Sequence, residues 1–329
     1  MILSVGIDIG TSTTQLIFSR LTIENRASSY TVPRIDIVDK EVIYRSKIYF
    51  TPLRSATEID AEAVKRIVRE EYQAAGMTPE MLRTGAVIIT GETARKENAN
   101  EVLEALSDLA GDFVVATAGP DLESVLSARG AGTDALSKEK RTAIANVDIG
   151  GGTTDIAVIT LGSMACSTSL KLAGDALTAA VQRFVQEKYQ IVVGENMAER
   201  IKIALGSVAP LPVPLSFEVS GKDLATASPR TIALSDTDTR EAFQPITEKL
   251  VSAVMGILEV TPPELGADIM RQGMLLTGGG ALLRGFADRI TKATRIPVYV
   301  DSDPLTTVLR GAGITLDDPE KYRDLLIEC

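Results

Sequence analysis

Three short turns in this sequence combine glycines with small hydroxyl residues in a way suited to holding phosphate groups. A bound phosphate needs several N–H donors that converge on it and a backbone that can approach without interference from Cβ atoms. Small-residue turns meet both needs. The candidate phosphate- and nucleoside-binding residues are Gly10, Thr11, Ser12, Thr13 and Thr14, then Gly150, Gly151, Gly152, Thr153 and Thr154, and finally Gly278, Gly279 and Gly280.

Two of these turns repeat one pattern. Residues 8–15 read DIGTSTTQ and residues 148–155 read DIGGGTTD. A single such turn is about as often an ordinary tight hairpin with glycines at positive φ. The duplicate, together with the third turn in MLLTGGGALL at residues 274–283, favours the phosphate-binding interpretation.

Two better-known phosphate-binding turns do not fit. The pattern Gly-x4-Gly-Lys-Ser/Thr is absent from the chain. The residues after Gly152 alternate like a strand, whereas a dinucleotide-binding turn opens a helix. We therefore expect the phosphates to lie between hairpins.

Asp8 and Asp148 precede the two repeated turns. At such a position a carboxylate can hold the waters of a Mg²⁺ ion that bridges phosphates. The alternative is that each aspartate caps its turn through neighbouring backbone groups, and the repeat favours the metal. The sequence contains no histidine, which excludes Ser-His-Asp and Cys-His catalysis and every histidine-ligated metal site.

The turns are flanked by alternating apolar runs typical of strands. Residues 2–9 and 16–21 predict one hairpin, and residues 144–149 and 156–161 predict a second. The repeat predicts a duplicated α/β fold in which each half is a mixed sheet covered by helices. The expected helices span residues 60–75, 98–109, 176–189 and 240–258.

We expect two domains with the boundary in the charged stretch before the second hairpin. The first comprises residues 1–144 with an insert at about 30–57, and the second comprises residues 145–329 with an insert at about 188–243. Prolines at alternate positions in residues 209–214 favour an extended connection over a central strand.

Composition narrows the class of protein. A chain of 329 residues is long enough for two cores, and a net charge of -10 without a dense Lys/Arg run argues against nucleic-acid partners. The longest apolar stretch, around residues 250–260, is too short for a transmembrane segment, so we expect a cytoplasmic protein. Cys166 and Cys329 are expected to be free thiols.

These turns resemble those of the superfamily that contains actin, sugar kinases and DnaK-type chaperones, in which two RNase-H-like lobes clamp Mg-ATP. The resemblance implies two actin-like lobes around a nucleotide cleft, each with an inserted subdomain, and ATP or ADP with Mg²⁺ as ligands. It also implies that residues 11–14 and 150–154 hold the β- and γ-phosphates and that residues 278–280 contact the nucleoside. Asp8, Asp148 and Asp155 would serve the metal and the attacking water.

The two halves resemble different families of that superfamily. Residues 1 to about 150 resemble the ethanolamine ammonia-lyase reactivating factor EutA, which rescues a cobalamin enzyme using ATP. The similar segments are SVGIDIGT (4–11), VIITGETA (87–94) and AGPDLESV (118–125). Residues 146–315 resemble the rod-shape-determining bacterial actin MreB, in AGD (173–175), AERIKI (198–203), TPPEL (261–265) and LTGGGALLR (276–284). A recombined or engineered chimera is the simplest account.

The MreB resemblance adds two residues to the site. It implies that Glu199 and Lys202, one helical turn apart, line the ribose and adenine pocket. Without the motif, an ordinary exposed ion pair worth little would be the preferred interpretation.

One departure concerns hydrolysis. In the rod-shape actins a glutamate that positions the attacking water stands just before a proline, and here Ala118-Gly119 precede Pro120. Glu92 and Asp155 are the remaining candidates for that catalytic role, although either is equally an ordinary loop carboxylate. We therefore expect a weak, slow Mg-dependent ATPase.

Three functions compete. The first is a chaperone-like reactivating factor that acts on a client enzyme, a cobalamin-dependent ammonia-lyase, and the second is an MreB-like filament that acts in cell shape. The third, a small-molecule kinase, ranks last because no acceptor site is visible. We favour the reactivating factor, because filament contacts would have to match subdomains that resemble different families.

Overall fold

The computed structural model describes residues 1–25, 35–55, 58–90, 93, 96–107, 109, 113–118 and 120–315. The chain divides into two compact units. Unit 1 comprises Met1–Gly130 and Thr306–Cys329, and unit 2 comprises Ala131–Leu305. The expected lobe boundary at 144/145 is placed by the repeated hairpin, whereas the two units are defined by which residues pack together. That boundary stays a prediction.

Unit 1 is built on a mixed sheet. Its strands are β1 (Ile2–Ile9), β2 (Thr13–Asn25), β3 (Ile35–Arg45), β4 (Tyr49–Phe50), β5 (Leu82–Thr90) and β6 (Phe113–Ala118). The order is β3-β2-β1-β5-β6, and β4 also pairs with β2. The predicted hairpin of β1 and β2 is present, and β2 runs past residue 21 because it pairs with β3 as far as Asn25.

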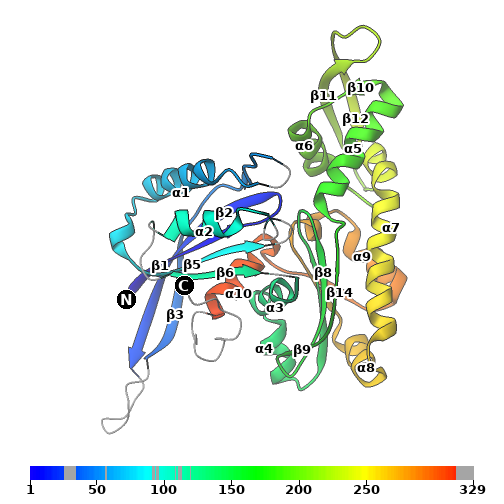
Figure 1. Ribbon diagram of the computed structural model, residues 1–329. Coiled ribbons are helices and arrows are strands. Elements are labelled where there is room, and N and C mark those ends of the chain that lie inside the picture. Colours follow the sequence, from blue (N-terminus) through cyan, green and yellow to red (C-terminus); the bar gives the residue numbers. More distant parts are fainter. Residues whose placement is uncertain are drawn as a thin grey trace. The chain divides into compact units, whose positions relative to one another are not determined.

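Helices cover both faces of this sheet. They are α1 (Ala61–Ala75), α2 (Ala99–Ser107), α3 (Pro120–Gly130) and α10 (Thr307–Thr315), with a short 3-10 turn η1 (Pro79–Met81) (Figure 1). Val87 and Ile89 of β5 share a core with α1 and α2, whereas Ile88 packs with Leu126 of α3 and Ala312 of α10. Because neighbouring side chains of a strand point to opposite faces, this alternation places a helical layer on each side.

Unit 2 contains a second mixed sheet. Its strands are β7 (Ala143–Ile149), β8 (Thr154–Thr160), β9 (Ser163–Leu170), β13 (Met274–Thr277) and β14 (Val298–Val300). The order β14-β13-β7-β8-β9 repeats the order β6-β5-β1-β2-β3 of unit 1. In both sheets the first strand pairs antiparallel with its hairpin partner and parallel with its other neighbour. The duplicated fold predicted from the repeated turn is therefore visible in the topology.

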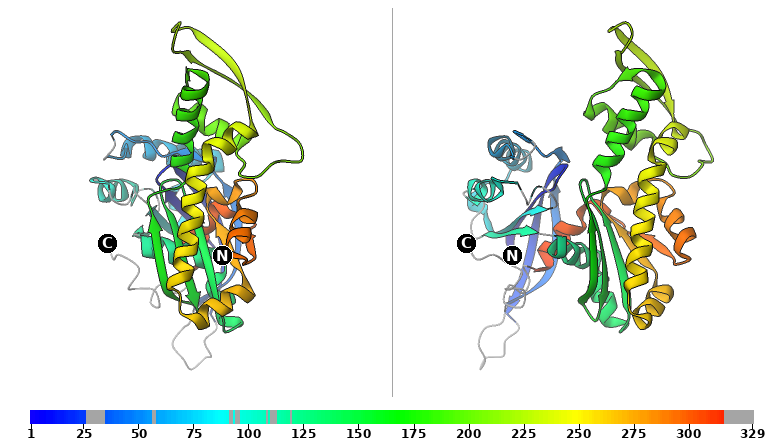
Figure 2. Two further views of the ribbon diagram at one scale, coloured as in Figure 1. Left: turned by 90° about the vertical axis from the view of Figure 1, so that its right-hand side faces the viewer. Right: turned by 45° about the vertical axis from the view of Figure 1, so that its right-hand side comes forward.

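The helices of unit 2 lie mainly beside this sheet. They are α4 (Thr133–Glu139), α5 (Gly174–Tyr189), α6 (Glu195–Leu205), α7 (Asp236–Val260), α8 (Pro263–Gln272) and α9 (Phe286–Thr294), with the 3-10 turns η3 (Gly279–Leu282) and η4 (Pro304–Thr306) at its end. Figure 2 shows α7, in yellow, along one face of the sheet, where Leu250 and Val254 join the core of β7. The helix expected at 240–258 starts earlier because Ser235 and Asp238 form a capping box.

A small subdomain extends unit 2 within residues 188–243. Strands β10 (Ile191–Val192), β11 (Ser216–Asp223) and β12 (Pro229–Ser235) form a three-stranded antiparallel sheet. This sheet and α5, α6 and α7 enclose a separate core around Ile201, Val219 and Phe243. Residues 209–214 form neither helix nor strand, in agreement with the expected connection.

Throughout the part of the chain that the structure describes, every helix is too short or too polar to cross a membrane.

Candidate functional site

The first candidate turn, Gly10–Thr14, closes the β1–β2 hairpin of unit 1. Asp8 pairs with Gln15 and Ile9 with Thr14, and the Gly10 N–H donates to the Thr13 carbonyl at 2.8 Å. Thr14 is fully buried, Thr11 and Ser12 are partly exposed, and Thr13 is exposed. Residues 11–13 are therefore the part of this turn that a ligand can reach.

The second candidate turn, Gly150–Thr154, has the same geometry in unit 2. Asp148 pairs with Asp155 and Ile149 with Thr154, and the Gly150 N–H donates to the Thr153 carbonyl at 2.9 Å. The repeat seen in the sequence is thus a repeat of register and of turn hydrogen bond. Asp148 and Asp155 are buried and lie opposite each other across the hairpin.

Helix α5 begins directly against the second turn. The Gly174 N–H donates to the Gly150 carbonyl at 3.1 Å, and the Asp175 N–H donates to the Gly151 carbonyl at 2.8 Å. The first amides of a helix have no partner within the helix, and here two of them bind the turn. The backbone of Gly150 and Gly151 is therefore fixed by the start of α5.

Glu199 and Lys202 of α6 lie at the same place. The Lys202 Nζ is 2.6 Å from the Glu199 Oε2 and donates to the Gly174 carbonyl at 3.2 Å. The Thr178 hydroxyl donates to the same Glu199 oxygen at 2.5 Å. The two charged side chains are only 17% and 19% exposed, so this is not an ordinary exposed ion pair. The structure brings both residues to the end of α5 that contacts the second turn.

The glycine turn 278–280 follows β13, beside the second hairpin turn, because Thr277 pairs with Asp148 in parallel register. Gly278 has φ +76°, and a Cβ there would lie 2.3 Å from the Asp148 Oδ1. A Cβ on Gly280 would lie 2.3 Å from the Ile149 Cγ2. Packing against β7 thus requires both glycines. Gly279 is exposed and has no such neighbour, which leaves it accessible to a ligand.

The glycine turn continues into the short 3-10 turn η3, and α9 begins only at Phe286. Gly278 and Gly285 both have positive φ, a conformation that glycine adopts most readily, so the backbone between β13 and α9 is irregular on either side of η3. The extra turn of chain places Arg284 against α6, a contact that the sequence pattern did not reveal.

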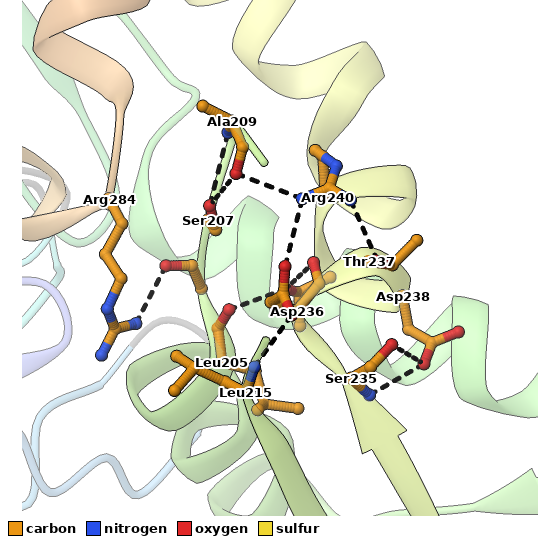
Figure 3. Close-up of polar contacts among 12 residues, drawn as sticks. Leu205, Ser207, Ala209, Leu215, Ser235, Asp236, Thr237, Asp238, Arg240 and Arg284 are labelled. Atoms are coloured by element: carbon orange, nitrogen blue, oxygen red, sulfur yellow. Dashed lines mark hydrogen bonds and ion pairs between the residues drawn. The ribbon is translucent and has the colours of Figure 1, made fainter. Parts of the chain in front are cut away.

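Polar contacts hold the C-terminal end of α6, as Figure 3 shows. The Arg284 Nη1 donates to the Gly206 carbonyl at 3.0 Å, and the Thr239 hydroxyl donates to the Leu205 carbonyl at 3.0 Å. The Arg240 Nη1 binds both the Ala209 carbonyl at 3.1 Å and the Asp236 Oδ2 at 3.2 Å. The helix that carries Glu199 and Lys202 is thereby tied to the segment after the glycine turn and to α7.

Asp8 in unit 1 has an unusual environment. Desolvation raises the pKa of its carboxyl to about 7, although hydrogen bonds with Thr90 and Gln15 lower it. The Thr90 hydroxyl lies 3.3 Å from the Asp8 Oδ1. Near neutral pH a nearby cation would therefore shift this group strongly toward the carboxylate.

The candidate metal residues do not form a preformed cluster. Within the described ranges, the structure contains no group of three or more His, Cys, Asp or Glu side chains that could hold a metal ion. Mg²⁺ usually keeps several waters and takes one or two carboxylates together with phosphates, so a single carboxylate such as Asp8 in unit 1 or Asp148 in unit 2 can serve it without a cluster. Glu92 and Gly119 lie outside the described residues.

Solved structures define the class of fold. MreB 5 of Spiroplasma citri bound to AMPPNP superimposes with a TM-score of 0.72 over 98% of both chains, at 24% identity. A MamK double helical filament superimposes with a TM-score of 0.65 over 96% of this chain and 99% of that chain, at 19% identity. The predicted actin-like ATPase fold is confirmed.

Two family profiles match half of the chain or more. "Ethanolamine utilisation protein EutA" matches residues 1–206, and "Cell division protein FtsA" matches residues 145–315. The chain belongs to the EutA family through the first region and to the FtsA family through the second. The EutA match extends past the expected join near residue 150, so the two matched regions overlap over residues 145–206, from within β7 to the end of α6.

Curated relatives show the same division. The ethanolamine ammonia-lyase reactivase EutA of Salmonella typhimurium is 43% identical over 189 residues, which are 57% of this chain and 40% of that protein. The cell shape-determining protein MreB of Escherichia coli is 44% identical over 195 residues, 59% of this chain and 55% of that protein. The chain matches only about half the length of each relative, and both resemblances found in the sequence are confirmed.

Proposed function

We propose that this chain binds ATP with Mg²⁺ and hydrolyses it slowly. The observation that carries the proposal is the repeated hairpin turn. Gly10 and Gly150 make the same hydrogen bond at 2.8 and 2.9 Å, and an aspartate occupies the same register position in both hairpins. The solved relative that holds AMPPNP gives independent support.

Each group of predicted residues has a role in this proposal. Residues 10–14 and 150–154 hold phosphate oxygens through their amides and hydroxyls, as small-residue turns do. The Lys202 ammonium and the exposed Gly279 flank the second turn, and with Glu199 and the rest of the glycine turn they contact the nucleoside. In unit 2 these parts are linked by the hydrogen bonds of Gly174 with Gly150 and Lys202 and by the pairing of Thr277 with Asp148.

Magnesium binding is proposed for Asp8 and Asp148. Asp148 lies opposite Asp155 on the hairpin, and two carboxyls placed directly opposite on a sheet would repel each other if both were ionised. A cation held by Asp148 would relieve that repulsion, and one held by Asp8 would offset the desolvation that raises the pKa to about 7. Mg²⁺ bound there would supply charge neutralisation for the phosphates. Asp155 or Glu92 then orients the water in place of the glutamate missing before Pro120.

Calorimetric titration of the folded protein with Mg-ATP and Mg-ADP tests this proposal. We expect saturable binding whose affinity falls when EDTA removes the metal. We also expect a nucleotide at a hundredfold excess over its dissociation constant to raise the free energy of unfolding by about 2.7 kcal/mol. Asp148→Asn should lower the Mg²⁺-dependent part of the affinity, while Asp134→Asn, at an aspartate outside the turns, should not. Absence of both heat and thermal stabilisation in folded protein would refute the proposal.

For the cellular role we propose a chaperone-like reactivating factor, supported by the EutA match over residues 1–206. Its client would be a cobalamin-dependent ammonia-lyase. The alternative is a filament-forming actin that acts in cell shape, supported by the MreB relatives and the MamK filament. Sedimentation and electron microscopy with and without Mg-ATP separate the two. Filaments favour the alternative, and ATP-dependent recovery of the inactivated enzyme in their absence favours the reactivating factor.

A further inference from the structure

The first turn is held by hydroxyl groups from outside the predicted site. The Thr51 hydroxyl donates to the Gly10 carbonyl at 2.7 Å, and the Thr51 N–H donates to the Ser12 carbonyl at 3.0 Å. The Thr51 hydroxyl also lies 3.0 Å from the Thr14 hydroxyl. Thr93 adds a second hydroxyl donor to the Gly10 carbonyl at 3.1 Å. Thr51 is thus the residue that contacts the turn at both ends and in its middle.

The segment that carries Thr51 is itself fixed. Strand β4 pairs with the start of β2, so that Tyr49 lies opposite Thr14 and Phe50 opposite Thr13. The Tyr49 hydroxyl donates to the carboxylate of Glu71 on α1, which is buried. The link runs from the helical layer through β4 to the turn, and Thr51 is its last member.

Unit 2 solves the same problem by other means. There the Gly150 carbonyl, which corresponds to the Gly10 carbonyl, accepts from the Gly174 N–H of α5, and Gly151 accepts from Asp175. In both turns the carbonyl of the first glycine and one further carbonyl are engaged from outside the hairpin. The need to fix these carbonyls is therefore common to the two turns, and in unit 1 a threonine meets it.

We propose that Thr51 is a positioning residue for the first phosphate-binding turn. By engaging the carbonyls of Gly10 and Ser12, it keeps the turn in one conformation and leaves the amides of residues 11–13 arranged for an anion. A turn that is ordered in advance loses less conformational freedom when the ligand binds. The role in binding rests on the proposed nucleotide function, whereas the ordering of the turn does not.

The test compares Thr51→Val, which removes the hydroxyl at nearly constant volume, with Thr51→Ser, which keeps it. Thr247→Val is the matched control, because its buried hydroxyl binds carbonyls of its own helix, those of Phe243 and Gln244. Loss of the Thr51 hydroxyl removes its bonds to the Gly10 carbonyl and the Thr14 hydroxyl, which predicts about tenfold faster hydrogen exchange in a peptide spanning residues 8–15 without nucleotide. We also expect about tenfold weaker Mg-ATP binding in Thr51→Val. Thr51→Ser and Thr247→Val should stay within about twofold of wild type in both measurements.

The two measurements distinguish failure of this inference from failure of the proposed function. Unchanged exchange at residues 8–15 in folded Thr51→Val overturns the inference, and so does unchanged Mg-ATP affinity in a protein whose wild type binds. If the wild type binds no nucleotide, the proposed function fails, and the binding role of Thr51 fails with it, while the exchange result still decides whether Thr51 orders the turn. Thr51→Ala takes the place of Thr51→Val should the valine variant not fold.

Discussion

The two hairpin turns are alike in sequence and register but are held in place differently. In unit 1 the Gly10 carbonyl accepts from the side chains of Thr51 and Thr93. In unit 2 the Gly150 carbonyl accepts from a backbone amide at the start of α5. A duplicated chain has thus kept the turn and changed its support.

This difference decides how each turn can be disrupted. A side-chain hydroxyl is removed by one substitution, whereas a backbone amide is kept by every substitution except proline. The second turn should therefore be disrupted mainly by substitutions that add a Cβ at a closely packed glycine. The first turn should be disrupted by substitutions that remove a polar side chain, and the sequence pattern does not reveal which side chain that is.

The largest effect is expected in unit 1, at Asp8. Its pKa rises from 3.8 in the unfolded chain to about 7 in the folded protein. The folded protein favours the neutral carboxyl. The free energy of unfolding is therefore highest below about pH 4 and falls as pH rises toward 7, because over this range the unfolded chain loses the proton more readily than the folded protein. At 1.36 kcal/mol per pH unit, the loss is roughly 4 kcal/mol.

Asp8→Asn should therefore unfold like wild type at pH 4 and be more stable than wild type at pH 8. Denaturant unfolding without Mg²⁺ at the two pH values, followed by a spectroscopic signal from unit 1, measures this difference directly. A constant difference between variant and wild type across the pH range would contradict the desolvation of this carboxyl in the folded protein.

In unit 2 two neighbouring glycines test whether the glycine turn packs closely against β7. Gly280→Ala places a Cβ 2.3 Å from the Ile149 Cγ2, whereas Gly279→Ala meets nothing closer than the Leu305 Cδ2 at 3.5 Å. We expect Gly280→Ala to lower the free energy of unfolding by about 3 kcal/mol. Gly279→Ala should change it by less than about 0.5 kcal/mol. Equal losses in thermal or denaturant melts would mean that β7 and the glycine turn are not in contact as described.

A smaller effect is expected at Lys202, which reaches the Gly174 carbonyl beside the second turn. Lys202→Met should weaken Mg-ATP binding about tenfold, or about 1.4 kcal/mol. The matched control is Arg271→Met, which breaks an ion pair of the same i,i+3 spacing with Asp268 at a largely exposed position. Calorimetry that finds equal affinities for the two variants would show that Lys202 has no part in the ligand site.

Much of the fold could be predicted because its signals are local. Alternating apolar residues on either side of a small-residue turn predict each hairpin, and their repetition predicts the duplicated sheet. The length of β2 could not be predicted, because its continuation to Asn25 depends on pairing with β3. The late start of α9 likewise depends on two glycines at positive φ and on the packing of Gly280 against Ile149.

The candidate site divides along the same line. Gly10, Gly150 and Asp148 could be picked out because their spacing repeats within the chain. Thr51 could not, because it contacts a carbonyl 41 residues earlier from a position just after a strand of only two residues. A family motif indicates that Glu199 and Lys202 belong to the site. The contact of both residues with the start of α5 depends on tertiary packing, which the sequence does not show.

The most direct test of the central claim measures hydrogen exchange of the wild-type protein with and without saturating Mg-ATP. We expect slower exchange in the peptides that span residues 8–15, 148–155 and 278–283, because bound phosphates and nucleoside would order all three turns. Peptides from α8, which lies outside the turns, should exchange at the same rate in both conditions. Equal exchange in all three turns, with nucleotide present at saturation, would contradict the claim that they form the ATP site.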